Sequence, residues 1–292
     1  MTQTDIIQLI HKHFPDVRWN ELAFHDNGWD HAVAILDERL VFRAPRDLPE
    51  SPPDKLLHEA GFLKHLLKQA TIGLPNYLYM AEDHSIGGYE ILKGNELSAE
   101  NFRSLDEDSI ESIVHQIAGF LNVLHTTPNT VANNFGLQEG KDYHSRDMFG
   151  KTEQLVLPKL NSQESAIVLS RLALLRATLV TSRPVVPVHL DLHDEHILWD
   201  GFHKQVSVID FGDMALGDPA YDFAGFWDLG EAFARKVFDH YTGVQDEGIL
   251  LRSRVFYNCF SISMMKDSFE GWPITFEYAY KRFISSIQDS ER

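Results

Sequence analysis

Residues 188–222, VHLDLHDEHILWDGFHKQVSVIDFGDMALGDPAYD, contain the motifs from which the fold and chemistry of this chain can be argued. Within them, two apolar runs at 196–199 and 205–211 lie on either side of the turn-forming pair Asp200-Gly201. Short apolar runs separated by a turn are typical of a β-hairpin. The stretch therefore predicts two antiparallel strands whose outer ends lie next to each other.

Three charged or imidazole side chains stand at the outer ends of this hairpin. Asp191 and His196 come before or at the start of the first strand, and Asp210 comes at the end of the second. Because a hairpin brings its ends together, we expect these three residues to converge. Converging carboxylates repel one another unless they share a cation, and the motif contains no neighbouring Lys or Arg. The arrangement therefore predicts a metal-assisted reaction.

Length and composition set the scale of the fold. A chain of 292 residues that is 43% hydrophobic is long enough for a sizeable core, which at this size commonly divides into two lobes. The single cysteine, Cys259, lies in an apolar run and is expected to fill a core rather than form a disulfide. The sequence has neither a signal-peptide pattern at its start nor an apolar run of transmembrane length. We therefore expect a cytoplasmic, two-lobed protein.

The charge of the chain restricts its partners. Its 26 Lys and Arg residues against 43 Asp and Glu residues give a net charge of −17. This charge opposes binding to nucleic acid or to an anionic membrane and would attract a cationic small molecule. The alternative is that the charge serves only solubility. The chain is expected to act as a monomer or a dimer.

The order of predicted elements changes near residue 93. Before it, we expect mainly short strands and one helix after the N-terminal helix, with strands at 21–24, 31–36, 39–44, 77–81 and 88–92 and a helix at 54–70. After it, apart from the hairpin, we expect helices at 106–125, 147–160, 162–180, 230–241, 247–269 and 276–287. The fold class is therefore α+β, with a small β-rich lobe at residues 1–93 and a larger helical lobe at 94–292.

One carboxylate of the small lobe needs explaining. Glu59 stands at the edge of the buried face of the helix at 54–70, where it would need a cation, and Arg43 at the end of the third strand could supply it. The alternative is that Glu59 is an ordinary solvated helix residue.

The motifs together resemble a known family. His189-x-Asp191, with His196 five residues after the aspartate, is followed by the hairpin, by Ile209-Asp210-Phe211-Gly212-Asp213, and by Asp218-Pro219-Ala220-Tyr221-Asp222. This combination is similar to the aminoglycoside phosphotransferase family of the protein-kinase-like fold, and in motif it is closest to the 2″-aminoglycoside and macrolide types. The resemblance spans nearly the whole chain and implies a bilobal kinase-like fold.

The resemblance also implies roles for individual residues. Asp191 would orient the acceptor hydroxyl and accept its proton, while His196 and Asp210 would hold Mg²⁺ against the phosphates of ATP or GTP. The residues implied for nucleotide binding are Gly28, Arg43, Glu59, Glu90, Ile91 and Leu92.

Two of these residues depart from the wider pattern. Most relatives have Asn where this chain has His196, and an imidazole is a less usual Mg²⁺ ligand than an amide oxygen. The 2″-aminoglycoside and macrolide types resemble this chain in having His, so the departure indicates a subgroup. Arg43 stands where kinases usually have Lys, which makes its contact with phosphate less certain than its ion pair. Leu190, where many relatives have a small or polar residue, is unremarkable by comparison.

The acceptor is expected between Asp191 and the C-terminal helices. Acidic and aromatic side chains in this region suit a polyamine sugar, namely Asp213, Asp222, Asp228, Glu231, Glu270 and Trp272. They predict a cationic acceptor, an aminoglycoside before a macrolide. The alternative for these residues is structural, as helix caps and core.

Three other functions compete with antibiotic phosphorylation. A kinase for a small hydroxylated metabolite would share every catalytic motif. A nucleotide-binding pseudokinase would be expected to lack Asp191 or Asp210, and both are present. A zinc hydrolase site built on His189, Asp191, His193 and His196 would leave Asp210-Phe211-Gly212 unexplained.

Overall fold

A five-stranded antiparallel sheet forms the N-terminal part of this computed structural model, which describes residues 1–25, 31–46, 54–140, 146–181, 183–244 and 246–288. Its order is β1-β2-β3-β5-β4. The strands are β1 (Leu22–His25), β2 (His31–Leu36), β3 (Leu40–Pro45), β4 (Tyr79–Met80) and β5 (Gly87–Glu90). In the register of the central pairs, Val33 lies opposite Arg43, and Leu40 opposite Glu90. The five predicted strands are confirmed, the one at 31–36 without change and the others with ends shifted by one or two residues.

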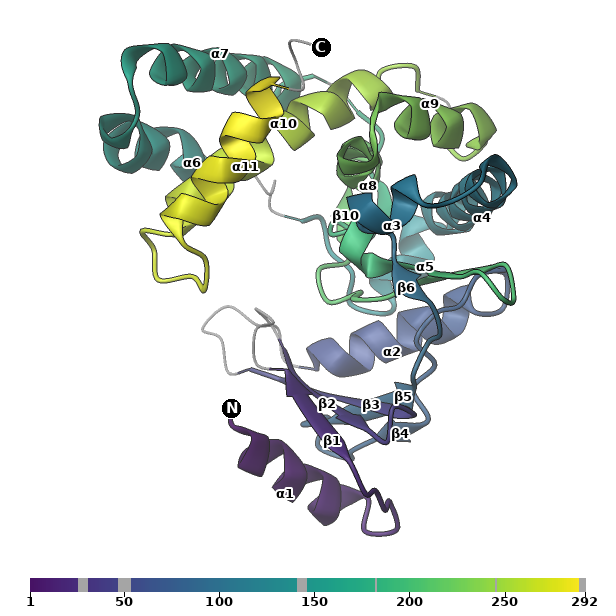
Figure 1. The fold of residues 1–292 in the computed structure, drawn as a ribbon. Coiled ribbons are helices and arrows are strands. Elements are labelled where there is room, and N and C mark those ends of the chain that lie inside the picture. Colours follow the sequence, from purple (N-terminus) through teal and green to yellow (C-terminus); the bar gives the residue numbers. More distant parts are fainter. Residues whose placement is uncertain (26–30, 47–53, 141–145, 182, 245, 289–292) are drawn as a thin grey trace.

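Two helices cover the two faces of this sheet (Figure 1). Helix α1 (Gln3–His13) buries Ile6 and Ile10 in an apolar cluster with strands β2 and β3. Helix α2 (Lys55–Leu66) lies on the opposite face, between the sheet and the helical part of the molecule. Its residues Phe62 and Leu66 are buried in the cluster that forms the core of the C-terminal part. Helix α2 is therefore packed against both parts.

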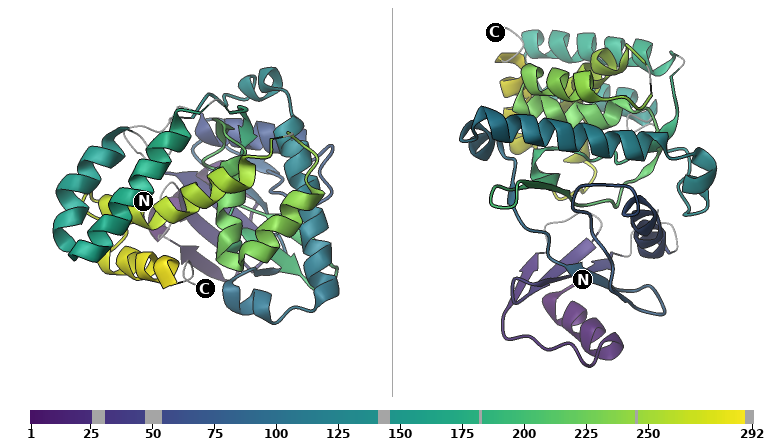
Figure 2. Two further views of the ribbon diagram at one scale, coloured as in Figure 1. Left: turned by 90° about the horizontal axis from the view of Figure 1, so that it is seen from above. Right: turned by 90° about the vertical axis from the view of Figure 1, so that its right-hand side faces the viewer.

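The C-terminal part is mainly helical and lies at the other end of the molecule (Figure 2, right). Its longer helices are α4 (Glu107–Thr126), α7 (Ser162–Leu179), α9 (Glu231–His240), α10 (Ile249–Asp267) and α11 (Phe276–Gln288). Shorter ones are α3 (Ala99–Arg103), α5 (Asn129–Asn133), α6 (Arg146–Lys151) and α8 (Ala220–Ala224). Asp106 caps α4 by accepting a 2.7 Å hydrogen bond from the amide of Ser109. The α+β, two-lobed fold class is confirmed.

One predicted helix differs from the structure. The helix expected at 147–160 ends as α6 at Lys151 and continues as a π-helical turn, Thr152–Val156, and a 3-10 turn, Leu157–Lys159. Pro158 lies in that last turn and lacks the amide hydrogen that an α-helix would need there.

The predicted hairpin is present as β8 (Ile197–Asp200) and β9 (Gln205–Val208). Asp200 pairs with Gln205, and its Oδ1 accepts hydrogen bonds from the amides of Phe202 and His203, which closes the turn. Strand β6 (Asn95–Glu96) adds to β8, and β7 (Val186–Val188) pairs with β10 (Ala215–Gly217). These two- and three-residue strands are too short for periodicity to reveal.

No helix in the described ranges is both long and apolar enough to cross a membrane.

Candidate active site

The hairpin brings Asp191, His196 and Asp210 together, as its topology predicts. Nδ1 of His196 lies 3.4 Å from Oδ2 of Asp191, and Nε2 lies 3.8 Å from Oδ2 of Asp210. Nδ1 is also 2.8 Å from the backbone carbonyl of Asp191. A carbonyl oxygen only accepts hydrogen bonds, so Nδ1 carries the proton and Nε2 presents its lone pair on the side of Asp210.

This geometry fits a divalent cation. An imidazole lone pair and a carboxylate oxygen on the same side of the loop form a mixed nitrogen and oxygen donor pair, which the carbonyl of Asp191 holds in the required tautomer. His193 lies beside the pair, with Nε2 3.7 Å from Oδ1 of Asp191. Asp191, His193 and His196 also offer ligand atoms within 4.8 Å of one another.

The loop that contains Asp191 is held by a buried carboxylate. Asp222, at the start of α8, accepts hydrogen bonds from the amides of His189 at 2.9 Å and Leu190 at 2.8 Å. Its Oδ2 also lies 3.0 Å from Nε2 of His125, and the Asp222 side chain is fully buried. The prediction that Asp222 contacts an acceptor is therefore wrong, because no face of this carboxylate is accessible.

Two residues of the site have left-handed backbone conformations. Leu190 has φ of 69° and Asp210 has φ of 60°. This region costs a residue with a β-carbon about 1–2 kcal/mol, and aspartate tolerates it better than leucine. The expectation that Leu190 is unremarkable is therefore wrong, because its left-handed backbone next to Asp191 would suit glycine better than leucine.

Arg43 connects the sheet to the site. Its Nη1 donates a 2.7 Å hydrogen bond to Oε1 of Glu59, and its Nη2 donates a 2.6 Å hydrogen bond to Oδ1 of Asp210. Tyr77 donates a second hydrogen bond, of 2.8 Å, to the same oxygen of Glu59. The predicted pair of Arg43 and Glu59 is confirmed, and both side chains are buried.

The charges of this cluster control its protonation. Burial by itself would raise the pKa of Asp210, but the guanidinium of Arg43 and the neighbouring imidazoles together hold that pKa well below its usual range. Burial raises the pKa of Glu59, and the charge of Arg43 opposes that rise. Asp210 is therefore an anion at neutral pH, which is the form that can hold a cation.

His31 is a further residue of the site, which no motif of the sequence predicts. It lies at the start of β2 with 3% of its surface exposed, and its Nδ1 is 3.1 Å from Nη2 of Arg43. A guanidinium only donates, so Nδ1 must accept and the proton is on Nε2, which has no hydrogen-bond partner among the described residues. Burial and the charge of Arg43 lower the pKa of His31, which agrees with a neutral ring. Alternate residues of a strand lie on one face of the sheet, so the spacing of His31, Val33 and Ile35 is the feature of the sequence that places His31 on the same face as these two apolar residues.

A cleft of about 490 Å³ lies between the sheet and the hairpin. Apolar side chains line most of it, and its charged lining residues are Arg43, Glu96 and Asp210. The apolar members are Val33, Ile35, Val41, Tyr89, Ile91, Leu92, Leu198 and Ile209.

The segment expected to read a purine runs along this cleft. Ile91 and Leu92 line the cleft, whereas the side chain of Glu90 is exposed and is not part of the lining. The amide of Ile91 already donates to the carbonyl of Arg39 at 2.8 Å. Gly28, expected over the phosphates, lies outside the described residues.

The acidic side chains expected to bind an acceptor mostly have basic partners. Asp228 accepts from Arg282 at 3.1 Å and from the hydroxyl of Tyr257 at 3.1 Å. Burial raises the pKa of Asp228, and the charge of Arg282 opposes the rise.

The remaining members of that set are more exposed. Glu231 pairs with Arg235 on its own helix at 2.8 Å, and Glu270 pairs with Lys266 at 2.7 Å and with Lys151. Asp213 is exposed, and Trp272 is 41% exposed at the start of the segment before α11. The set does not form one acidic cluster, and its charge is largely compensated.

Comparison with known proteins gives a family and a fold. A sequence model described as the phosphotransferase enzyme family matches residues 21–250. The GDP complex of wild-type aminoglycoside 2′-phosphotransferase-IIIa is 21% identical, with a TM-score of 0.82 over 98% of each chain. The GDP and kanamycin complex of APH(2″)-IIia is 21% identical, with a TM-score of 0.79 over 98% of this chain and 97% of that one. Macrolide 2′-phosphotransferase type I is 19% identical, with a TM-score of 0.65 over 98% and 97%.

Proposed function

Because this chain belongs to the phosphotransferase enzyme family, we propose that it moves the γ-phosphate of ATP or GTP to a hydroxyl group of a small molecule. The observation that carries the proposal is the convergence of Asp191, His196 and Asp210 beside a cleft between the sheet and the hairpin. We also propose that the boundary between the two lobes lies between residues 93 and 94, shortly before strand β6, which pairs with β8.

Asp191 is the residue proposed to act on the acceptor. Its carboxylate orients the hydroxyl and takes its proton as the acceptor oxygen forms a bond to the γ-phosphorus. The bond from that phosphorus to the oxygen bridging to the β-phosphate breaks, and the nucleoside diphosphate leaves with the electron pair. The buried carboxylate of Asp222 keeps the Asp191 loop in place through two backbone amides.

His196 and Asp210 are proposed to hold Mg²⁺. When bound, this ion would neutralise charge on the phosphates. Asp210 supplies an anionic oxygen and His196 supplies the lone pair of Nε2, which the carbonyl of Asp191 leaves unprotonated.

The nucleotide is proposed to occupy the cleft with its base against the apolar part. The amide of Ile91 is used by Arg39, so the carbonyl of Glu90 and the amide of Leu92 are the backbone groups proposed to read the purine edge. Arg43 stands at the phosphate side, where its guanidinium is oriented by Glu59 and His31. Gly28 would close over the phosphates.

The acceptor is proposed to be an aminoglycoside first and a macrolide next. The net charge of −17 supports a cationic molecule. A neutral hydroxylated metabolite is the alternative acceptor. The ion pairs of Asp228 with Arg282 and of Glu270 with Lys266 favour it, because these carboxylates are already paired with basic side chains.

A labelled-nucleotide panel tests this proposal. The protein would be incubated with Mg²⁺ and γ-labelled ATP or GTP, each with an aminoglycoside, a macrolide, a neutral polyol or no acceptor. Label on an aminoglycoside or macrolide supports the leading acceptor class, and label only on the neutral polyol supports the second. Nucleotide binding without transfer of the labelled phosphate to any of these acceptors would count against the transferase assignment.

A further inference from the structure

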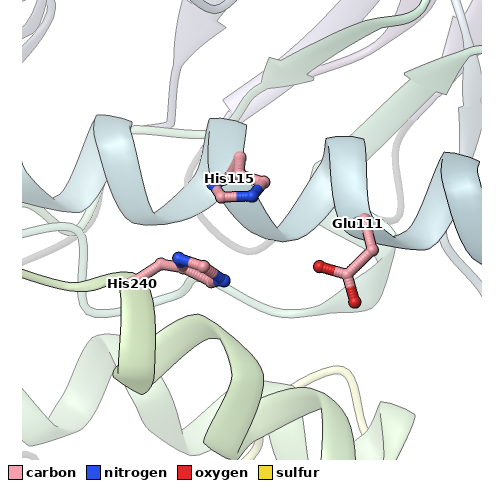
Figure 3. Close-up of side chains that lie close together, drawn as sticks. All are labelled: Glu111, His115 and His240. Atoms are coloured by element: carbon pink, nitrogen blue, oxygen red, sulfur yellow. The ribbon is translucent and has the colours of Figure 1, made fainter.

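A second cluster of metal-ligating side chains lies on the outer surface of the C-terminal part, remote in sequence from the catalytic loop. Glu111 and His115 belong to α4, and His240 is the last residue of α9 (Figure 3). One ligand atom from each lies within 4.8 Å of the other two. None of the three has a role in the proposed transfer reaction.

We propose that Glu111, His115 and His240 form a site for a divalent transition-metal ion such as Zn²⁺, which joins helix α4 to helix α9. Two imidazoles and a carboxylate favour Zn²⁺, Co²⁺, Ni²⁺ or Cu²⁺ over Mg²⁺, which prefers oxygen ligands. Three protein ligands leave a fourth tetrahedral position for water.

The spacing of the ligands on the helices supports this site. Glu111 and His115 are four residues apart, so they lie one turn apart on one face of α4. Figure 3 shows the side chain of Glu111 extending from α4 into the space between the two helices, where the ring of His240 also lies. The rings of His115 and His240 have centroids 4.0 Å apart at an interplanar angle of 48°. The two imidazoles are therefore close without being stacked.

Both imidazoles are available as ligands. Within the described part of the chain, the imidazole of neither His115 nor His240 makes a hydrogen bond or an ion pair, and both residues are exposed. His240 ends α9, where the helix dipole favours a cation. Tetrahedral bonds of about 2.0–2.1 Å set ligand atoms roughly 3.4 Å apart. In the structure the ligand atoms lie within 4.8 Å of one another, and rotation of the exposed side chains can bring them to that shorter separation.

Packing beneath the site holds the two helices in register. Val114 and Ile117 of α4 and Phe233 and Val237 of α9 are buried in the same apolar core. Ligands placed on rigid, packed helices lose less freedom on binding than ligands on loops.

Lys236 is the competitor for this site. Its Nζ donates to Glu111 at 2.5 Å and also contacts Glu107, and it precedes His240 by one helical turn. The hydrogen bond from Lys236 lowers the pKa of Glu111, which is therefore an anion at neutral pH. On metal binding, the carboxylate of Glu111 would contact the ion in place of Lys236, and Lys236 would stay paired with Glu107.

Co²⁺ absorption measures binding at this site independently of transferase activity. The full chain, freed of any affinity tag, would carry His193→Ala and His196→Ala, which remove two imidazoles of the other candidate group. We expect this protein to give visible Co²⁺ bands that Zn²⁺ displaces and excess Mg²⁺ does not. Adding His115→Ala or His240→Ala should weaken Co²⁺ binding by at least about 10-fold.

Two matched variants complete the test. His203→Ala removes an exposed imidazole outside the cluster and should leave Co²⁺ binding unchanged. Lys236→Met removes the ion pair between Lys236 and Glu111 that metal binding would otherwise have to break. The variant should therefore bind Co²⁺ about 5-fold more tightly, the factor that corresponds to one pair of unit charges about 4 Å apart in water. Circular dichroism would show that each variant is folded. Co²⁺ affinity that is the same with and without His115 or His240 would overturn the proposal, and binding unchanged or weakened by Lys236→Met would remove Glu111 from the site.

Discussion

Nη2 of Arg43 lies 2.6 Å from Oδ1 of Asp210, so a residue of the sheet directly contacts the loop that follows the hairpin. The same guanidinium is 2.7 Å from Glu59 on α2. Two elements that are adjacent along the chain therefore meet, at one buried cation, a loop residue that lies 167 positions after Arg43. The contact that holds Asp210 therefore exists only while the N-terminal sheet and the C-terminal part are packed together.

The first prediction concerns this buried cation. Arg43→Met leaves the buried carboxylate of Glu59 without a counter-charge, and we expect a loss of about 3–5 kcal/mol in the free energy of unfolding. Urea denaturation would measure the loss. Arg43→Met combined with Glu59→Gln should recover part of it, because the uncompensated charge is then gone. Additive losses from the two single variants would contradict a coupled pair.

The second prediction concerns Asp222. Asp222→Asn replaces one acceptor oxygen with an amide donor that faces backbone N–H groups, so we expect a loss of about 1–3 kcal/mol in stability and a lower kcat. Asp108→Asn, on the exposed first turn of α4, is the matched control and should change neither. If Asp222 instead contacted the acceptor, the variant would raise the acceptor KM and leave the unfolding curve unchanged.

The third prediction uses the left-handed backbone of Leu190. Leu190→Gly and Leu190→Ala both remove the leucine side chain, but only glycine relieves the cost of φ at 69°. Glycine should therefore be more stable than alanine here by about 1 kcal/mol. At Leu198, within strand β8, the order should reverse. Thermal unfolding would compare the stability of the four variants. If the alanine variant were more stable than the glycine variant at both positions, the backbone of Leu190 would not be strained.

The fourth prediction concerns the thiol of Cys259, which is fully buried in α10. Burial raises its pKa to about 12, although the charge of Arg171 opposes the rise. A raised pKa keeps the thiol protonated, so at pH 8 only about one molecule in ten thousand carries the reactive thiolate. An aromatic disulfide reagent should therefore react with no thiol in the native chain and with one in guanidinium chloride. Rapid reaction of the native chain at pH 8 would show that this core is open.

The part of the site that sequence predicts is the local part. A hairpin fixes the relation of its own ends, so the meeting of Asp191, His196 and Asp210 follows from the two apolar runs and the turn between them. The pairing of Arg43 with Glu59 could be inferred from the position of a carboxylate on a buried helix face. Both inferences use residues whose elements are adjacent along the chain.

The parts that sequence did not predict depend on contacts between distant segments. The contact of Arg43 with Asp210 joins residues 167 positions apart, and nothing in either motif specifies it. The sequence favours acceptor binding for Asp222, because an aspartate near a helix start suits several roles and its burial depends on distant segments. The acidic residues Asp228 and Glu270 gain Arg282 and Lys151 from other helices, which no local pattern indicates.

The most direct test of the central claim is phosphate transfer by Asp191→Asn. Steady-state transfer from γ-labelled nucleotide to the acceptor found in the panel would be measured beside nucleotide affinity, for the wild type, Asp191→Asn and the surface control Asp108→Asn. We predict that Asp191→Asn lowers kcat by at least about 100-fold, because the carboxylate that takes the hydroxyl proton is gone, while nucleotide affinity stays unchanged. Turnover near that of the wild type in Asp191→Asn would contradict the assignment of this residue and the mechanism built on it.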